Sequence, residues 1–190
     1  MRLKPNAVTN GLYATYVVPY TRNEIVKIIV ACDQIGRSSY ERRRARAMTL
    51  LMRHAGLRIS DVVTLSLEHI RGNRLEKRAV KNNKWIRVEL PAAVLEALDL
   101  LPPPKATARG NKRYFYSDTT GLRSLVKGAW RTMDAVFKLS GVEGAHPHRF
   151  RHTLASELLG KGGSIEKVAG ILGDNPATIS RYYAKWTPEY

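Results

Sequence analysis

Five residues that lie far apart in the chain have side chains suited to chemistry on a phosphate group: Arg58, Lys81, His148, Arg151 and Tyr183. Two arginines can neutralise the charge that builds on a phosphoryl group under attack, because each guanidinium donates paired hydrogen bonds to its oxygens. A lysine and a histidine can transfer protons, and a tyrosine hydroxyl can act as a nucleophile. Brought together by a fold, these residues would form a site for phosphoryl transfer through a tyrosine.

Arg58 lies in the segment GLRISD at 56–61, where the pattern predicts the end of one helix and the beginning of another. Ser60 or Asp61 is suited to cap the second helix. Asp61 is also placed to hold the guanidinium of Arg58. Taken alone, the hexapeptide fits an ordinary surface arginine beside a helix cap better than a phosphate ligand.

Lys81 is followed by Asn82 and Asn83, and the three residues separate two β-like runs at 74–80 and 84–90. This pattern predicts a β-hairpin with Lys81 at its tip. Lysines in turns are commonly just exposed to solvent. The functional interpretation is a general acid beside the phosphate, with its pKa lowered by neighbouring arginines.

His148 and Arg151 are three residues apart on a helix predicted over 147–160, so they share a face. A buried arginine must be paired with an anion, and a DNA phosphate is a suitable one. Arg149 and His152 are expected to point elsewhere, with His152 in the core or in support of the site.

Tyr183 lies beside Tyr182 on the last predicted helix, over 176–186. Adjacent helical residues point about 100° apart, so only one tyrosine can face the site. The other is expected to pack with Trp186. We expect the cationic side chains around Tyr183 to activate its hydroxyl, which ordinarily ionises near pH 10.

The elements that must position these residues are mostly helical, and they predict a mainly α domain with a small antiparallel sheet, an α+β fold. Thr21 and Glu24 form a capping-box pattern at the start of the first helix. One helix is expected to turn Val126, Trp130, Met133 and Phe137 to the same face. The full set of expected helices is 21–33, 39–55, 61–67, 91–101, 122–139, 147–160, 164–172 and 176–186, with a basic surface loop at 102–112. Residues 1–20 are expected to be a lead-in or linker, and 21–190 the catalytic domain.

The charge of the chain favours a polyanionic partner. Its 190 residues include 32 Lys and Arg against 16 Asp and Glu, a formal net charge of +16. Such an excess favours nucleic acid through phosphate contacts and counterion release. A ribosome-associated or merely basic protein is the alternative. The basic run at 41–47 fits either a solvated helix face or a stripe along the DNA backbone.

The only cysteine, Cys32, lies in an apolar stretch and is expected to be a buried small hydrophobe. One cysteine allows neither an internal disulfide nor a cysteine-based zinc site. The sequence has no signal-peptide pattern and no apolar run of about 18 residues. We therefore expect an intracellular protein in a reducing compartment, without a membrane span.

Four segments together resemble one family. GLRISD, VKNNKWIRVELP, HPHRFRHTLASELL and ILGDNPATISRYYAKW occur in the order of the motifs of the tyrosine recombinases, also called the phage-integrase family. The resemblance extends over about residues 21–186. It implies the fold of that family's catalytic domain and DNA cleavage and rejoining for site-specific recombination or integration, as in mobile elements.

The resemblance also implies roles for individual residues. Tyr183 would attack a phosphodiester, form a 3′-phosphotyrosyl link and release a 5′-hydroxyl, without metal or ATP. Tyr183, and not Tyr182, lies nine residues after Asp174, as the family spacing requires. Arg58 and Arg151 would clamp the phosphate, Lys81 would protonate the leaving oxygen, and His148 would assist as a base or hydrogen-bond partner.

This chain departs from the family pattern at two places. Asp174 stands where the family usually has a His or Trp that donates to the phosphate, so we expect it to face away, to cap a helix, or to reduce activity. An N-terminal core-binding domain is not recognisable in the first twenty residues, which fits a catalytic fragment or a minimal form. The implied partners are double-stranded DNA and further copies of the chain on it, as a dimer or tetramer, in a prokaryotic or phage-infected cytoplasm at the nucleoid.

Three other interpretations remain open. The segment at 164–186 reads as a helix-turn-helix, which would make the chain a non-catalytic DNA-binding protein. A recombinase relative that binds DNA without cutting it is the second. The type IB topoisomerases, which share the phosphotyrosine chemistry, are the third.

Overall fold

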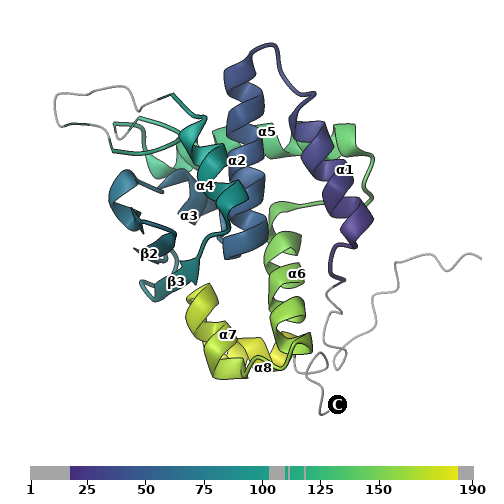
Figure 1. Ribbon diagram of the computed structural model, residues 1–190, viewed down its shortest axis with the longest axis vertical. Coiled ribbons are helices and arrows are strands. Elements are labelled where there is room, and N and C mark those ends of the chain that lie inside the picture. The colour runs from purple at the N-terminus through teal and green to yellow at the C-terminus, as the bar shows by residue number, and fades with distance from the viewer. Residues whose placement is uncertain (1–17, 103–109, 111, 118, 184–190) are drawn as a thin grey trace, which may run out of the picture.

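A computed structural model describes residues 18–102, 110, 112–117 and 119–183 (Figure 1). The described part is mainly α with a small antiparallel sheet, as predicted. Its helices are α1 (Arg22–Cys32), α2 (Ser39–Ala55), α3 (Ile59–Val63), α4 (Ala92–Asp99), α5 (Leu122–Ser140), α6 (Pro147–Gly160), α7 (Ile165–Leu172) and α8 (Pro176–Tyr183). The strands are β1 (Ile70–Arg71), β2 (Arg74–Arg78) and β3 (Trp85–Glu89), preceded by a 3₁₀ turn at Leu67–His69.

Helices α1 and α2 begin where the sequence predicts. The Thr21 side chain accepts from the backbone of Glu24, and the Glu24 carboxylate accepts from the backbone of Thr21, so the capping box is confirmed. Helix α2 opens with a second capping box, between Ser38 and Glu41, and ends at Gly56 in the left-handed conformation.

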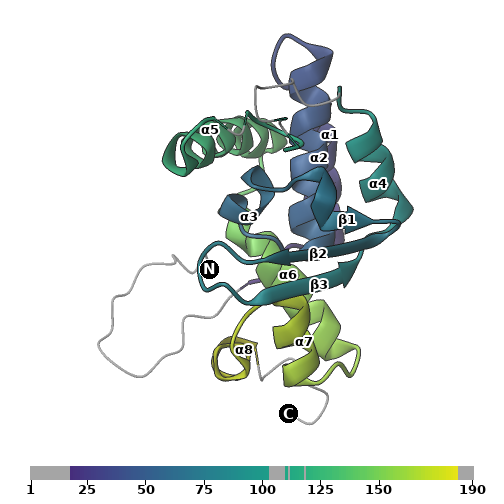
Figure 2. The same ribbon diagram turned by 90° about the vertical axis from the view of Figure 1, so that its left-hand side faces the viewer.

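The three strands pair in the order β1-β2-β3, all antiparallel. The predicted hairpin is confirmed, with Arg78 opposite Trp85 at its outer end and Arg74 opposite Glu89 at the other. Strand β1 was not predicted, because two residues are too few to show an alternating pattern. Figure 2 shows the sheet above α7 and α8, with β3 as the strand nearest to them.

Two expectations about helices need correction. The third helix was expected over 61–67, but α3 covers Ile59–Val63 and a separate 3₁₀ turn follows it. On α5 the buried stripe runs through Leu125, Ala129, Met133 and Val136, a spacing that leaves Trp130 about 100° away and 44% exposed. Phe137 and Met133 are buried as predicted.

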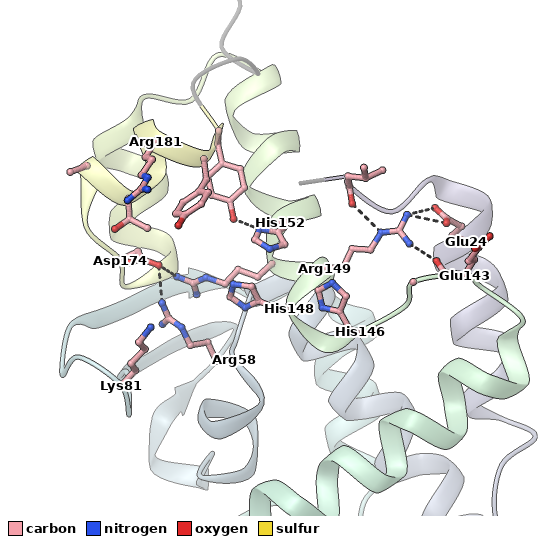
Figure 3. A pocket seen from close by; sticks show the side chains of 17 residues that line it. Glu24, Arg58, Lys81, Glu143, His146, His148, Arg149, His152, Asp174 and Arg181 are labelled. Carbon is pink, nitrogen blue, oxygen red and sulfur yellow. Dashed lines mark hydrogen bonds and ion pairs between the residues drawn. The ribbon is translucent and has the colours of Figure 1, made fainter. Parts of the chain in front are cut away.

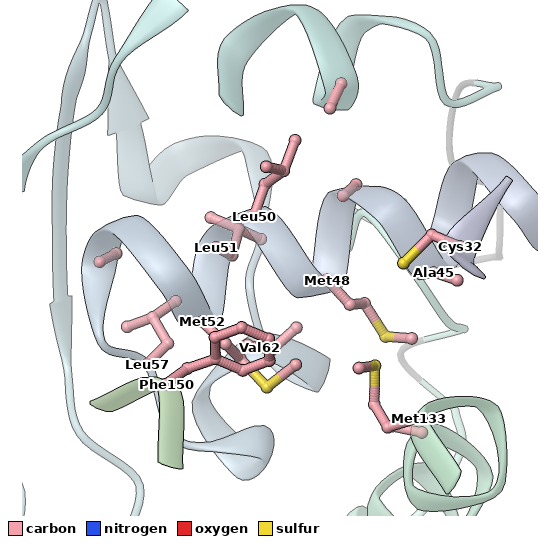
Figure 4. Packing of buried hydrophobic residues seen from close by; sticks show 14 of the residues in the cluster. Cys32, Ala45, Met48, Leu50, Leu51, Met52, Leu57, Val62, Met133 and Phe150 are labelled. Atoms are coloured by element: carbon pink, nitrogen blue, oxygen red, sulfur yellow. The ribbon is translucent and has the colours of Figure 1, made fainter. Parts of the chain in front are cut away.

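The hydrophobic core has two parts, and α6 belongs to both. The larger cluster includes residues of helices α1, α2, α3, α4, α5 and α6 and of the sheet. Figure 4 shows Phe150 of α6 beside Met52 of α2 and Val62 of α3, and Met48 of α2 facing Met133 of α5. The smaller cluster holds α7 and α8 on the far end of α6 through Ala155, Leu159, Val168, Ala169, Leu172, Ile179 and Tyr183. Cys32 is fully buried, as expected. Arg151 lies on α6 between the two clusters.

The chain enters the fold before α1. Tyr20 is 4% exposed, its backbone N–H donates to Thr153 Oγ1, and its hydroxyl donates to the carbonyl of His146. The segment just before α1 is therefore fixed to α6. The rest of the expected lead-in, most of the basic loop at 102–112, and Trp186 lie outside the described residues.

Candidate active site

Arg58 sits at the junction of α2 and α3. Gly56, at this junction, packs closely against α7. Its φ is +60°, and a Cβ there would lie 2.4 Å from Leu172 Cδ2. Arg58 is the N-cap residue of α3, and no side chain caps that helix, so the expected cap from Ser60 or Asp61 is wrong. The Arg58 side chain is 14% exposed and reaches from this junction toward α6.

Arg151 and Arg58 point their guanidinium groups at the same oxygen of Asp174, and Figure 3 labels Arg58 and Asp174. Arg151 Nη2 donates to Asp174 Oδ2 at 2.7 Å, and Arg58 Nη2 donates to the same oxygen at 2.8 Å. Arg151 Nη1 donates to the carbonyl of Gly56 at 3.0 Å. Arg58 Nη1 is buried and has no hydrogen-bond partner in the described residues. The two arginines thus form a clamp for an anion with one donor unused.

Asp174 is the anion in that clamp, so it neither faces away nor caps a helix through its side chain. Its Oδ1 accepts from the backbone of Asn175 at 3.0 Å, and the Asn175 side chain is the one that accepts from the first turn of α8, at Ala177. Burial alone would raise the pKa of this carboxyl, but the hydrogen bond and charge of Arg151, with Asn175 and Arg58, lower it. Asp174 is therefore ionised in the folded protein.

Asp61 does not hold Arg58, contrary to the expectation. It is fully buried, and its Oδ1 accepts from the backbone N–H of Val80 at 2.7 Å and from Lys77 Nζ at 3.4 Å. The Asp61 carboxylate instead anchors the outer end of the hairpin, next to Lys81, to α3. Sequence spacing placed Asp61 near Arg58 along the chain, but α3 turns the carboxylate toward the sheet.

Lys81 lies at the tip of this hairpin, in a turn where Asn83 adopts a positive φ of 56°. The tip rests against the turn between α7 and α8, because Asn82 Nδ2 donates to the carbonyl of Gly173 and Lys84 Nζ to that of Asp174. Lys81 itself is exposed and lines the same cavity as Arg58. No hydrogen bond or ion pair involves its amine within the described part of the chain. The hairpin therefore presents a free ammonium group beside the clamp.

The cavity has a volume of about 1330 Å³ and is open to solvent. It brings together all five predicted residues, and Asp174 with them. It is also lined by Tyr182 and Arg181 of α8, by His152 of α6 and by His146 at the N-cap of α6. The convergence expected from the sequence is thus observed, although the chemical role of each residue stays a prediction.

Tyr183 points from α8 into the molecule and is 4% exposed, whereas Tyr182 is 38% exposed. Tyr182 is thus partly exposed, and Trp186, with which it was expected to pack, lies outside the described residues. Burial raises the pKa of Tyr183 to about 12, and Arg151 and Arg58 lower it less than burial and Asp174 raise it. The expected activation by cationic neighbours is thus not achieved in the free protein, mainly because the Tyr183 hydroxyl is buried.

His152 was expected in the core or in support of the site, but its contact with Tyr183 was not predicted. It was expected to point away from His148, but its Nδ1 lies within hydrogen-bond distance of Tyr183 Oη, and its ring meets that of His148 edge-on at 4.5 Å. The signal was available, because residues 148 and 152 are four apart and share a helix face. Arg149 does point elsewhere, to Glu24 at 3.0 Å and over the ring of Tyr20.

Comparisons with known proteins agree with this arrangement. The family model for the phage integrase family matches residues 20–189, nearly the whole chain. The chain belongs to the phage integrase family. The match begins at buried Tyr20, which is the first core residue in the part of the chain that the structure describes.

Members of the phage integrase family resemble this chain at low sequence identity. Tyrosine recombinase XerC of Agrobacterium fabrum is 28% identical over 169 residues, covering 87% of this chain and 53% of that protein. The catalytic domain of bacteriophage HP1 integrase matches with a TM-score of 0.67 and 20% identity, over 92% of this chain and 90% of that one. The site-specific recombinase XerH matches with a TM-score of 0.68 and 19% identity, over 92% of this chain and 51% of that one. The chain spans about half the length of the curated relatives it matches.

The described residues contain no group of three or more His, Cys, Asp or Glu side chains that could hold a metal ion. Within the same residues, every helix is too short or too polar to span a bilayer.

Proposed function

We propose that this chain is the catalytic domain of a site-specific DNA recombinase of the phage integrase family. It cleaves one DNA strand through Tyr183, forms a 3′-phosphotyrosyl link, and rejoins the strand to a new 5′-hydroxyl without metal or ATP. The observation that carries the proposal is the pair of guanidinium groups converging on one oxygen in the cavity that also holds Tyr183. Two such forks are suited to the non-bridging oxygens of a phosphodiester.

In this proposal the scissile phosphate takes the place of the Asp174 carboxylate. Arg58 and Arg151 then hold its non-bridging oxygens and stabilise the charge that develops during attack. Arg58 Nη1, which is buried without a partner, gains an acceptor. Lys81 protonates the 5′ oxygen as it leaves, and His148 donates a hydrogen bond or accepts a proton at the clamp.

Asp174 lies in the short turn that leads into α8, the helix that carries Tyr183, so a movement of Asp174 can move Tyr183. Only the turn at 173–175 separates α7 from α8, and α8 carries Tyr183. Displacing the carboxylate puts one anion, the phosphate, in place of another between the arginines, so the charge in the clamp does not by itself lower the pKa of Tyr183. Binding of the DNA phosphate would instead act on Tyr183 through the position of α8.

The proposed partners follow from charge and from one relative. A net charge of +16 favours binding to double-stranded DNA. The XerH structure that this chain resembles is a post-cleavage complex on a palindromic substrate. A palindromic site presents two equivalent halves, so we propose that copies of this chain associate on DNA. The proposed place of action is the DNA-containing cytoplasm of a prokaryotic cell.

A recombinase relative that binds DNA without cutting it is the second candidate, and Asp174 favours it. An ionised carboxylate between the arginines repels phosphate, and the family's usual His or Trp donor is replaced. The helix-turn-helix interpretation has less support, since Ile179 and Tyr183 of α8 are buried against the rest of the domain. The domain division, with catalytic residues from 21 onward, is also part of the proposal.

The test is covalent trapping on nicked duplexes made from the DNA that flanks the coding sequence. After denaturation, wild-type protein is expected to give a protease-sensitive shifted band, and Tyr183→Phe is expected to give none. Tyr182→Phe is the matched control and should still give the band. Good DNA binding without any band from the wild type would favour the non-cleaving relative, and relaxation of supercoils without strand exchange would favour a type IB topoisomerase.

A further inference from the structure

The hydroxyl of Tyr183 meets an imidazole that the family motif does not include. Nδ1 of His152 lies within hydrogen-bond distance of Tyr183 Oη, and the two ring centroids are 5.6 Å apart. Figure 3 shows this contact between α6 and α8, with His148 one helical turn away. Among the described residues, His148 makes no hydrogen bond to Tyr183. The histidine of the His-x-x-Arg motif and the histidine on the nucleophile are therefore different residues.

Tyr183 needs a proton acceptor. Burial raises its pKa to about 12, so the phenol is protonated near neutral pH. A neutral phenol is a weak nucleophile, and its proton must leave as the bond from Oη to phosphorus forms. The side chain that touches the hydroxyl is the one able to take this proton over hydrogen-bond distance.

The surroundings of His152 keep its ring neutral in the free protein. The charged and titratable groups around it are Arg151 and His148 on α6, His146 at the N-cap, and Tyr183 on α8. Burial, together with these neighbours, lowers the pKa of His152 to about 3. A phosphodiester bound in the clamp takes the place of the Asp174 carboxylate, so an anion stays close to the ring while the proton is transferred.

We propose that His152 accepts the phenolic proton of Tyr183 during strand cleavage and returns it during rejoining. This inference rests on the proposed function. As Oη bonds to phosphorus, its proton passes to Nδ1, the P–O5′ bond breaks, and the leaving oxygen takes a proton from Lys81. In rejoining, a 5′-hydroxyl attacks phosphorus and gives its proton to Lys81, while the departing phenolic oxygen recovers its proton from Nδ1.

The geometry fixes the tautomer that this role requires. Nδ1 must be the unprotonated nitrogen, and Nε2 must carry the single proton of the neutral ring. His152 is partly buried and lines the open cavity, so Nε2 can exchange its proton with water. Nitrogen-15 NMR of histidine-labelled protein without DNA shows which ring nitrogen of His152 carries the proton. An unprotonated Nδ1 at neutral pH is expected, and a protonated Nδ1 would overturn the proposal, even if no variant can be made.

The kinetic test uses the nicked duplexes in two forms, with oxygen or sulfur as the 5′ bridging atom. Sulfur leaves as a thiolate and needs no proton, so it removes the need for Lys81. His152→Asn keeps an oxygen acceptor near the position of Nδ1 but is not basic. It is expected to slow attachment about 10²–10⁴-fold on both duplexes. Lys81→Ala should be slow only on the oxygen duplex.

Two comparisons separate a base from a positioning residue. The attachment rate of His152→Asn should rise about tenfold per pH unit in alkaline solution, as free phenolate forms, whereas the wild-type rate should change little. A His152→Asn protein that attaches at the wild-type rate, with only His152→Ala slow, would overturn the proposal and leave a hydrogen-bonding role. Failure of the wild type itself to attach would instead count against the proposed function.

Discussion

At the scale of single residues, Asp174 determines what the site can bind. Its Oδ2 accepts from both arginines of the clamp, and the Arg151 side chain beneath it is only 2% exposed. A carboxylate here satisfies two buried cations that would otherwise be costly. It also fills the position that a phosphate needs. Stability without DNA and affinity for DNA therefore oppose each other at this residue.

Replacing Asp174 with Asn should separate these two effects. The neutral amide leaves Arg58 and Arg151 without a counter-ion, so we expect the free energy of unfolding to fall by about 1–3 kcal/mol. Inorganic phosphate should restore part of this loss, because it can enter the clamp. Urea unfolding with and without phosphate measures both changes. Equal phosphate dependence in the wild type and the variant would contradict the clamp.

Residue types and spacing predicted the cationic groups and the tyrosine, but they did not predict how Asp61, Asp174 and His152 are used. Each of these depends on which way a short helix or turn directs a side chain. Asp61 is turned to the sheet by α3, and Asp174 is turned to the arginines by the α7–α8 turn. Only His152 could have been placed from the sequence, by its spacing of four from His148.

At the scale of elements, the outer end of the hairpin β2–β3 is held from two sides. Asp61 of α3 anchors it through Val80 and Lys77, and Asn82 at the tip contacts the backbone of the α7–α8 turn. The hairpin itself was predictable from two β-like runs around an Asn-Asn turn. Its docking was not, because the partners at 61 and 173 are far away in sequence.

The buried pair of Asp61 and Lys77 should be essential for this anchoring. Their side chains are 0% and 3% exposed. Asp61→Ala leaves the Lys77 ammonium and the Val80 N–H without their acceptor, so we expect a loss of about 3–5 kcal/mol in unfolding free energy. Adding Lys77→Met should recover part of it. If the double variant were as unstable as the single one, the charge of Lys77 would not be the cause.

Gly173 should be required for the contact between the α7–α8 turn and β3. Its φ is +60°, and a Cβ there would lie 2.6 Å from Ile86 Cγ1 and 3.1 Å from the carbonyl of Trp85. Gly72 is a matched control, because its φ is also +60° but nothing lies within 4 Å of a Cβ. Both alanine variants should lose about 1–2 kcal/mol from backbone strain.

Only Gly173→Ala should lose more than this, and only it should reduce covalent trapping, since it displaces Asp174 and α8 from the hairpin. Urea unfolding and the trapping assay measure these effects side by side. Similar losses in the two variants would mean that the contact with β3 has little energetic weight.

At the scale of the whole molecule, the two hydrophobic clusters and the net charge decide how DNA can be held. Helix α6 passes through both clusters and carries Arg151 between them, so the clamp lies where the two parts of the core meet (Figure 1). Helix positions and fold class were predictable from apolar periodicity. The division of the core was not, because it depends on how α7 and α8 pack on α6.

Binding to DNA should depend steeply on salt, given the net charge of +16. Between roughly 50 and 200 mM salt, we expect the affinity for a short synthetic duplex to fall at least about tenfold. With six to ten phosphate contacts the fall would be about 10³–10⁵-fold. Fluorescence anisotropy at a series of salt concentrations gives the slope, and a flat response would exclude binding dominated by phosphate contacts.

The most direct test of the account is to identify the residue that carries the DNA in a trapped complex. The complex formed on a nicked duplex would be digested with protease and nuclease, and the nucleotide-bearing peptide sequenced by mass spectrometry. The account predicts a 3′-phosphotyrosyl link on Tyr183. A link on Tyr182 or on any other residue would contradict it.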